Sequence, residues 1–74
     1  MQVGDLVKTQ IQDVDFEAGI TAIPVCTLGV IVEKEEILDN PNNPIMTVRL
    51  FLEGQVASYT NVYFQSDLEV VSNG

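Results

Sequence analysis

Two short runs of aliphatic and β-branched residues constrain the fold of this chain more than any other feature. The first run, Leu28–Glu33, begins beside a glycine and ends in charged residues, and the second extends from Ile45 to Leu52. β-Branched residues are enriched in strands, and runs this short fit strands better than helices. We therefore expect two central, mostly buried strands that pair with each other.

The second run alternates, and this alternation assigns one of its faces to the core. Met46, Val48, Leu50 and Leu52 share the face that we expect to be buried, and Ile45, Thr47, Arg49 and Phe51 share the other. In the first run, Val30 and Val32 fall on one side, and Gly29 and Ile31 on the other. Apolar residues on both sides predict that both faces of the first strand are partly covered.

Three further strands are expected, over Leu6–Gln10, Val56–Thr60 and Asp67–Val71. Between the last two, Asn61–Ser66 is expected to be a short irregular or 3₁₀ turn. No stretch of ten residues shows a helical apolar period. Five short strands separated by turns predict a small all-β barrel or sandwich, as one domain over residues 1–74.

Two connections are expected to be long loops. The first runs from Ile11 to Cys26, with Ile20 and Ile23 packing onto the core, and its Pro24 argues against a central strand there. The second, Glu35–Pro44, has two prolines and three asparagines within its last five positions, a composition typical of loops.

The charge balance narrows the classes of partner. Three basic residues face eleven acidic ones, which gives a net charge of −8. Nucleic acids and anionic membranes draw affinity from clustered cations, so both are disfavoured unless Lys8, Lys34 and Arg49 converge on one face. A protein partner is favoured, with a basic one as one version, and a homo-oligomer stays open. The plainer alternative is that the charge only keeps the protein soluble.

Compartment follows from what the sequence does not carry. Its single cysteine, Cys26, forms no intrachain disulfide, and Met1–Asp5 lack the basic and apolar regions of a signal peptide. No apolar run approaches the roughly 18 residues that span a bilayer. These features predict a protein of a reducing cytoplasm that does not enter a membrane.

The sequence offers no catalytic or cofactor-binding constellation. It has no histidine, which removes Ser–His and Cys–His pairs and, with one cysteine, ordinary zinc sites. We expect Cys26 to be a buried, inert thiol, because no cationic neighbour would activate it. Asp13, Asp15 and Glu17 alternate in the first long connection, and their spacing leaves a calcium site open. A solvated acidic loop is favoured, and neither an enzyme nor a bound cofactor is expected.

Four segments follow one another along the chain: Val3–Lys8, Gly29–Glu33, Val48–Gly54 and Ser66–Val71. In this order they resemble small SH3-like β-barrel proteins encoded by tailed phages, including phages of cyanobacteria. The opening VGDLVK and the closing DLEVV are the most specific parts of the match. The resemblance implies a five-stranded SH3-like barrel, with a long first loop and a Pro/Asn-rich loop between strands two and three. It implies no catalytic residues, because this barrel serves many unrelated roles.

The resemblance also implies a candidate partner-binding surface. In SH3-like barrels, aromatic side chains near the first loop and before the last strand can form a groove for a peptide. The corresponding rings here are Phe16, Phe51, Tyr59 and Tyr63. The alternative is that most of them pack in or against the core.

Three functions remain from the sequence. The first is a non-catalytic protein-interaction module, encoded by a phage as an accessory protein and binding a host or phage protein in the cytoplasm of an infected bacterium. The first alternative is a small structural subunit of a virion or other assembly. It predicts one exposed apolar patch made of Ile37, Leu38, Ile45 and Phe51. The second alternative is a nucleic-acid-associated SH3-like domain.

Overall fold

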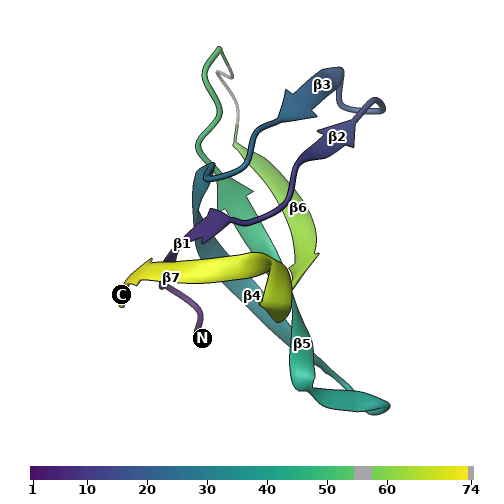
Figure 1. Ribbon diagram of the computed structural model, residues 1–74, viewed down its shortest axis with the longest axis vertical. Helices are drawn as coiled ribbons and strands as arrows, with labels where there is room; N and C mark the ends of the chain where they lie inside the picture. Colours follow the sequence, from purple (N-terminus) through teal and green to yellow (C-terminus); the bar gives the residue numbers. More distant parts are fainter. Residues whose placement is uncertain (55–57, 74) are drawn as a thin grey trace.

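Strands account for all the regular structure except one 3₁₀ turn in the part of the chain that the structure describes. The structure is a computed structural model, and it describes residues 1–54 and 58–73 (Figure 1). Its elements are β1 (Leu6–Thr9), β2 (Asp13–Asp15), β3 (Ile20–Ile23), β4 (Leu28–Ile37), β5 (Asn40–Leu50), β6 (Tyr59–Phe64), the 3₁₀ turn η1 (Gln65–Asp67) and β7 (Leu68–Ser72). The predicted all-β class is therefore confirmed.

Five strands form one antiparallel sheet, and two form a separate hairpin. The order in the large sheet is β6-β5-β4-β1-β7, and β2 pairs only with β3. Figure 1 shows the β2–β3 hairpin at the opposite end of the molecule from the β4–β5 turn. Among the described residues β6 and β7 are the two edges of the sheet and are not paired with each other, so the ladder is open.

The pairing of the two central runs is confirmed as the β4–β5 hairpin. Ile31 of β4 lies opposite Val48 of β5, and Gly29 lies opposite Leu50. Gly29 allows a close approach here, because a Cβ on it would lie 2.8 Å from the backbone oxygen of Arg49. Gly29 thus stands at a position of β4 where a larger residue would clash with β5.

The predicted Pro/Asn-rich loop over Glu35–Pro44 is wrong. β4 continues to Ile37 and β5 starts at Asn40, so the connection is a tight turn. Glu35 pairs with Ile45 and Ile37 with Asn40, which sets one residue of β4 against four of β5, from Pro41 to Pro44. Proline has no N–H to give to a ladder, and such an irregular stretch is where a sheet tolerates it.

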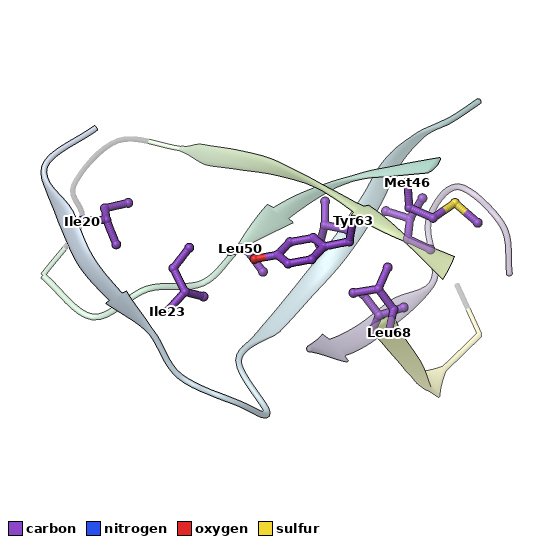
Figure 2. Packing of buried hydrophobic residues seen from close by; sticks show 9 residues of the cluster. Ile20, Ile23, Met46, Leu50, Tyr63 and Leu68 are labelled. Carbon is purple, nitrogen blue, oxygen red and sulfur yellow. The ribbon is translucent and has the colours of Figure 1, made fainter. Parts of the chain in front are cut away.

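One face of the large sheet, the inner face, holds the hydrophobic core. Its buried residues are Val7, Ile20, Ile23, Ile31, Met46, Val48, Leu50, Tyr63 and Leu68 (Figure 2). The predicted core positions Met46, Val48 and Leu50 are confirmed, and Leu52 packs partly against them. Both faces of β4 are partly covered as predicted, since Ile31 is buried on one side and Val30 is half-buried on the other, whereas Val32 is exposed.

The first long connection folds back over this inner face instead of remaining a plain loop. Its β2–β3 hairpin contributes Ile20 and Ile23, which are 6% and 0% exposed, as predicted. β3 ends at Ile23, immediately before Pro24. The hairpin therefore packs against the core at the end of the inner face away from the β4–β5 turn (Figure 1).

The strand prediction near the C-terminus is shifted. Asn61–Phe64 belong to β6 and are not an irregular turn, and only Gln65–Asp67 form the 3₁₀ turn. The expected strand over Val56–Thr60 lies partly outside the described residues, and its last two positions belong to β6. The polar Asn61 occurs within a strand because the β2–β3 hairpin supplies a partner for its side chain.

Candidate interaction surface

The side of the large sheet that the β2–β3 hairpin does not cover presents a continuous set of side chains. Strand neighbours place them together: Leu6 lies opposite Val30, Val30 opposite Arg49, and Arg49 opposite Thr60. Directly paired residues in a sheet point to the same face. We call this set the outer sheet face: Leu6, Lys8, Leu28, Val30, Glu33, Glu35, Ile45, Thr47, Arg49, Thr60, Val62, Phe64 and Glu69.

The outer sheet face carries exposed and half-buried apolar side chains in two groups, one made of Leu6, Leu28 and Val30 and the other of Ile45, Val62 and Phe64, with polar residues between them. Leu28, Val62 and Phe64 are 43%, 54% and 46% exposed, and Leu6, Val30 and Ile45 are half-buried. A soluble monomer rarely leaves contiguous apolar surface bare over a large area, and such patches mark interaction sites. This face is therefore the strongest candidate site on the described part of the chain.

The net charge of the outer sheet face is small, because its cations and carboxylates nearly cancel, whereas the rest of the chain is strongly negative. The face carries two cations and three carboxylates, a net charge of −1, whereas the remaining cation and eight carboxylates of the chain carry −7. Lys8 is paired with Glu69 at 3.4 Å between Nζ and Oε2. Arg49 is exposed, and among the described residues it makes no ion pair.

The three cations do not converge on one surface. Lys8 and Arg49 lie on the outer sheet face, but Lys34 lies opposite the buried Met46, and its Nζ donates a hydrogen bond to the backbone oxygen of Met1 at 3.2 Å. The condition under which nucleic-acid binding would be favoured is therefore not met.

The four aromatic residues predicted to bind a partner do not form one surface. Tyr63 is 3% exposed, and Figure 2 shows its ring within the core, so its assignment to a binding surface is wrong. Tyr59 is half-buried, and its hydroxyl donates a hydrogen bond to Asp15 Oδ2 at 2.7 Å. Phe16 and Phe51 are 74% and 53% exposed. The sequence signal for these positions is strand alternation over Tyr59–Phe64, which places Tyr63 inside and Val62 and Phe64 outside.

Two of the acidic residues of the first connection are structural anchors. Asp13 Oδ2 accepts a hydrogen bond from Asn61 Nδ2 at 3.0 Å, and Asp15 accepts the one from Tyr59. Both carboxylates are half-buried, so the expectation of a solvated acidic loop is wrong for them. Glu17 remains exposed. The anchors tie the β2–β3 hairpin to β6, the edge strand beneath it.

Burial, together with the carboxylates of these anchors, raises the pKa of both tyrosines of β6. Burial raises the pKa of the Tyr59 hydroxyl, and the hydrogen bond to Asp15 and that residue's negative charge raise it further. Burial, followed by the charge of Asp13, raises the pKa of Tyr63. Both phenols therefore stay neutral at pH values where free tyrosine begins to ionise.

Cys26 lies at the rim of a shallow groove. Its thiol is exposed, so the prediction of a buried thiol is wrong. The backbone turns sharply at this residue, which has a φ of +68°, and its N–H donates to the Thr9 oxygen at 2.7 Å. The groove has a volume of about 510 Å³ and is lined by Ile20, Ala22, Pro24, Cys26, Thr27, Leu28, Phe51, Leu52 and Glu53. The turn that directs the chain into β4 thus turns the thiol outward.

Within residues 1–54 and 58–73, no group of three or more acidic, cysteine or histidine side chains is placed to hold a metal ion. None of the helical structure in the same residues is long and apolar enough to cross a membrane. Comparisons with protein-family models, with characterised proteins and with solved structures give no match to this chain. The case for function therefore depends on the surface itself.

Proposed function

We propose that this protein is a non-catalytic protein-interaction module that binds its partner through the outer sheet face. One observation carries the proposal: an exposed apolar surface with little net charge, on a protein whose other surfaces are strongly acidic. Interface centres are depleted in charge, and their polar groups lie at the rim. Val62 and Phe64 on β6 and Leu28 on β4 supply its most exposed apolar side chains, and Glu35 and Glu69 supply part of the rim.

The proposal includes an SH3-like fold and a phage accessory role. The sheet order β6-β5-β4-β1-β7, a hairpin inserted between β1 and β4, and a 3₁₀ turn directly before β7 support the fold. The phage origin, and with it the cytoplasm of an infected bacterium as the place of action, is supported by the sequence resemblance alone. A host or phage protein is then the expected partner.

Loss of binding after a change on the outer sheet face tests the proposal. Val62→Asp places a charge in the apolar group that Val62 forms with Phe64 and Ile45, and Leu38→Asp is the matched control, because Leu38 is 99% exposed at the β4–β5 turn. Wild type and both variants are immobilised, and proteins retained from a bacterial lysate are identified at two salt concentrations. A candidate is then purified and its binding measured directly.

We expect the purified partner to bind wild type and Leu38→Asp alike and to bind Val62→Asp at least tenfold more weakly. Circular dichroism spectra that match for all three chains show that the loss is not unfolding. A partner that binds Val62→Asp as tightly as wild type contradicts the proposed surface.

A structural role in a virion or other assembly is the second candidate, and one observation favours it. Among the described residues thirteen large hydrophobic side chains are exposed and nine are buried, which suits a chain that is packed among neighbours. The single patch predicted for this role does not form, because Leu38 lies at the β4–β5 turn and Phe51 follows the opposite end of β5. Detection of the protein in purified particles supports this role, and its absence from them argues against it.

A further inference from the structure

We infer that the outer sheet face binds a second copy of this chain, as a face-to-face dimer in which Arg49 of each copy meets Glu33 of the other. The inference rests on the proposed function and names the partner. It is carried by the positions and charges of residues on the face, taken in turn below.

Charge selects this face for self-association. Two copies of this acidic chain repel each other. The repulsion is smallest when the copies meet through their outer sheet faces, each of which has a net charge of −1. A strongly basic partner would be drawn instead to the remaining surface, which carries −7. The low charge of the outer sheet face therefore fits a second copy better than a basic protein.

The face is also self-complementary at its centre. Glu33 lies opposite Thr47, two residues from Arg49 along β5, so Glu33 and Arg49 are diagonal neighbours on adjacent strands, about 7–8 Å apart. Both are exposed, and the described residues give neither an ion pair. In a dimer with two-fold symmetry each contact occurs twice, so an axis midway between the two residues brings each Arg49 onto the other copy's Glu33.

Two valines and two threonines flank this charge pair on the neighbouring strand positions. Val30 and Thr60 flank Arg49 across the strands, and Val62 lies beside Thr47. A standard interface buries roughly 800 Å² on each partner, which is about a sixth of the surface of this protein, 4818 Å² in total. A single face of a molecule this small is enough for such an area.

Salt should strengthen this dimer. Charges farther apart than about 10 Å are screened in 0.1 M salt, so salt weakens the repulsion between the two acidic bodies. The close Arg49–Glu33 pairs lose less, because screening acts mainly over longer distances. We expect the dissociation constant to fall at least threefold between 20 mM and 200 mM salt.

Charge exchange between copies gives a test with a definite signature. Arg49→Glu alone sets a carboxylate against Glu33 of the other copy, and Glu33→Arg alone sets a cation against Arg49. Each variant should therefore dissociate at least tenfold more readily than wild type. Mixed together, the two variants restore two opposite-charge pairs, and the double variant restores them within one chain. Glu17→Arg, at an exposed position of the β2–β3 hairpin, is the charge-matched control for Glu33→Arg.

The measurement is the mass in solution by light scattering over a range of protein concentration. We expect twice 8.1 kDa for wild type, Glu17→Arg, the mixture and the double variant, and the monomer mass for each single variant. A mixture that stays monomeric, or an Arg49→Glu variant that stays dimeric, overturns the inference. A monomeric wild type whose purified partner is still lost on Val62→Asp overturns the dimer and leaves the proposed function standing. A dimer with this charge signature, beside partner binding that Val62→Asp does not change, supports the inference and overturns the binding of a different protein at this face.

Discussion

The two faces of the large sheet are both rich in aliphatic side chains, yet the chain covers only one of them. On the inner face Val7, Ile31 and Val48 are at most 1% exposed, whereas Val62 and Phe64 on the outer sheet face are about half exposed. Strand alternation explains which residues share a face, but it does not say which face is covered. The exposed apolar residues of the outer sheet face therefore fit the proposed contact beyond the chain, in addition to the core within it.

The two faces also differ in whether their polar side chains bind other parts of the chain. The inner face has a hairpin held over it, since Asp13 and Asp15 are hydrogen-bonded to side chains of β6. Arg49 and Glu33, near the centre of the outer sheet face, have no ion-pair partner among the described residues. Hydrogen bonds to β6 thus hold the hairpin against the inner face, even though the buried Tyr63 hydroxyl of that face has no hydrogen-bond partner among the described residues.

Truncation of one aliphatic side chain on each face should show the largest contrast. We expect Ile31→Ala to lower the free energy of unfolding by about 2–5 kcal/mol, because it leaves a cavity in the core. Val62→Ala should change it by about 0.5 kcal/mol or less. Chemical denaturation at low protein concentration, where subunits are separate, measures both. Equal losses would mean that the outer sheet face is already packed within one chain.

Overpacking of the inner face at Gly29 should be the next largest effect. A Cβ there would lie 2.6 Å from Val48 Cγ1 and 2.8 Å from the Arg49 oxygen, so Gly29→Ala should cost about 1–3 kcal/mol. Adding Val48→Ala removes only the side-chain clash, so it should not restore wild-type stability. A stable Gly29→Ala protein in a denaturation experiment would contradict the close approach of β4 and β5.

The sequence predicts the core strands well because local pattern and tertiary packing agree there. In Ile45–Leu50 the alternation, the β-branched residues and the burial all indicate the same strand, and Met46, Val48 and Leu50 are buried as predicted. Ile20 and Ile23 were placed in the core from their apolar character alone, although their hairpin was not predicted. The apolar character of these two residues is enough to predict that they are buried, but it does not predict the hairpin that buries them.

The failures occur where long-range partners outweigh local signals. Prolines and asparagines in residues 41–44 indicate a loop, yet Asn43 exchanges hydrogen bonds with Ser66, from its Nδ2 to Ser66 Oγ at 3.1 Å and from the Ser66 N–H to its Oδ1 at 2.9 Å. Asn61 similarly finds Asp13 across 48 positions of sequence. Rules based on neighbouring residues cannot predict hydrogen-bond partners that lie this far apart in the sequence. The turn expected over Asn61–Ser66 includes Val62 and Phe64, so the sequence prediction does not contain the outer sheet face.

A smaller effect should follow from cutting one anchor of the hairpin. Tyr59→Phe removes the hydrogen bond to Asp15 and should cost about 1 kcal/mol, since both groups are half-buried. Asp15→Ala should cost a similar amount, and the double variant should cost less than the sum of the two. Phe16→Ala, next to Asp15 but exposed, is the control and should be close to neutral. Strict additivity in the denaturation free energies would mean that this bond does not hold the hairpin.

Alkaline pH should act on the same anchors and give the smallest effect at its onset. Tyr59 and Tyr63 have raised pKa values when folded, so between the unfolded value near 10 and the folded value the native state binds more protons than the unfolded state. Their contribution is fully present below pH 10, the unfolded value, and is lost as the pH rises from there through the raised folded values. The chain has two tyrosines and no tryptophan, so tyrosinate absorbance reports on these two groups alone. We expect that absorbance to appear together with loss of the circular dichroism signal, and to appear at lower pH in Asp15→Ala for Tyr59, because the carboxylate no longer opposes ionisation. Tyrosinate that forms near pH 10 in a chain that is still folded would show that β6 is open to solvent and that the hairpin does not close the inner face.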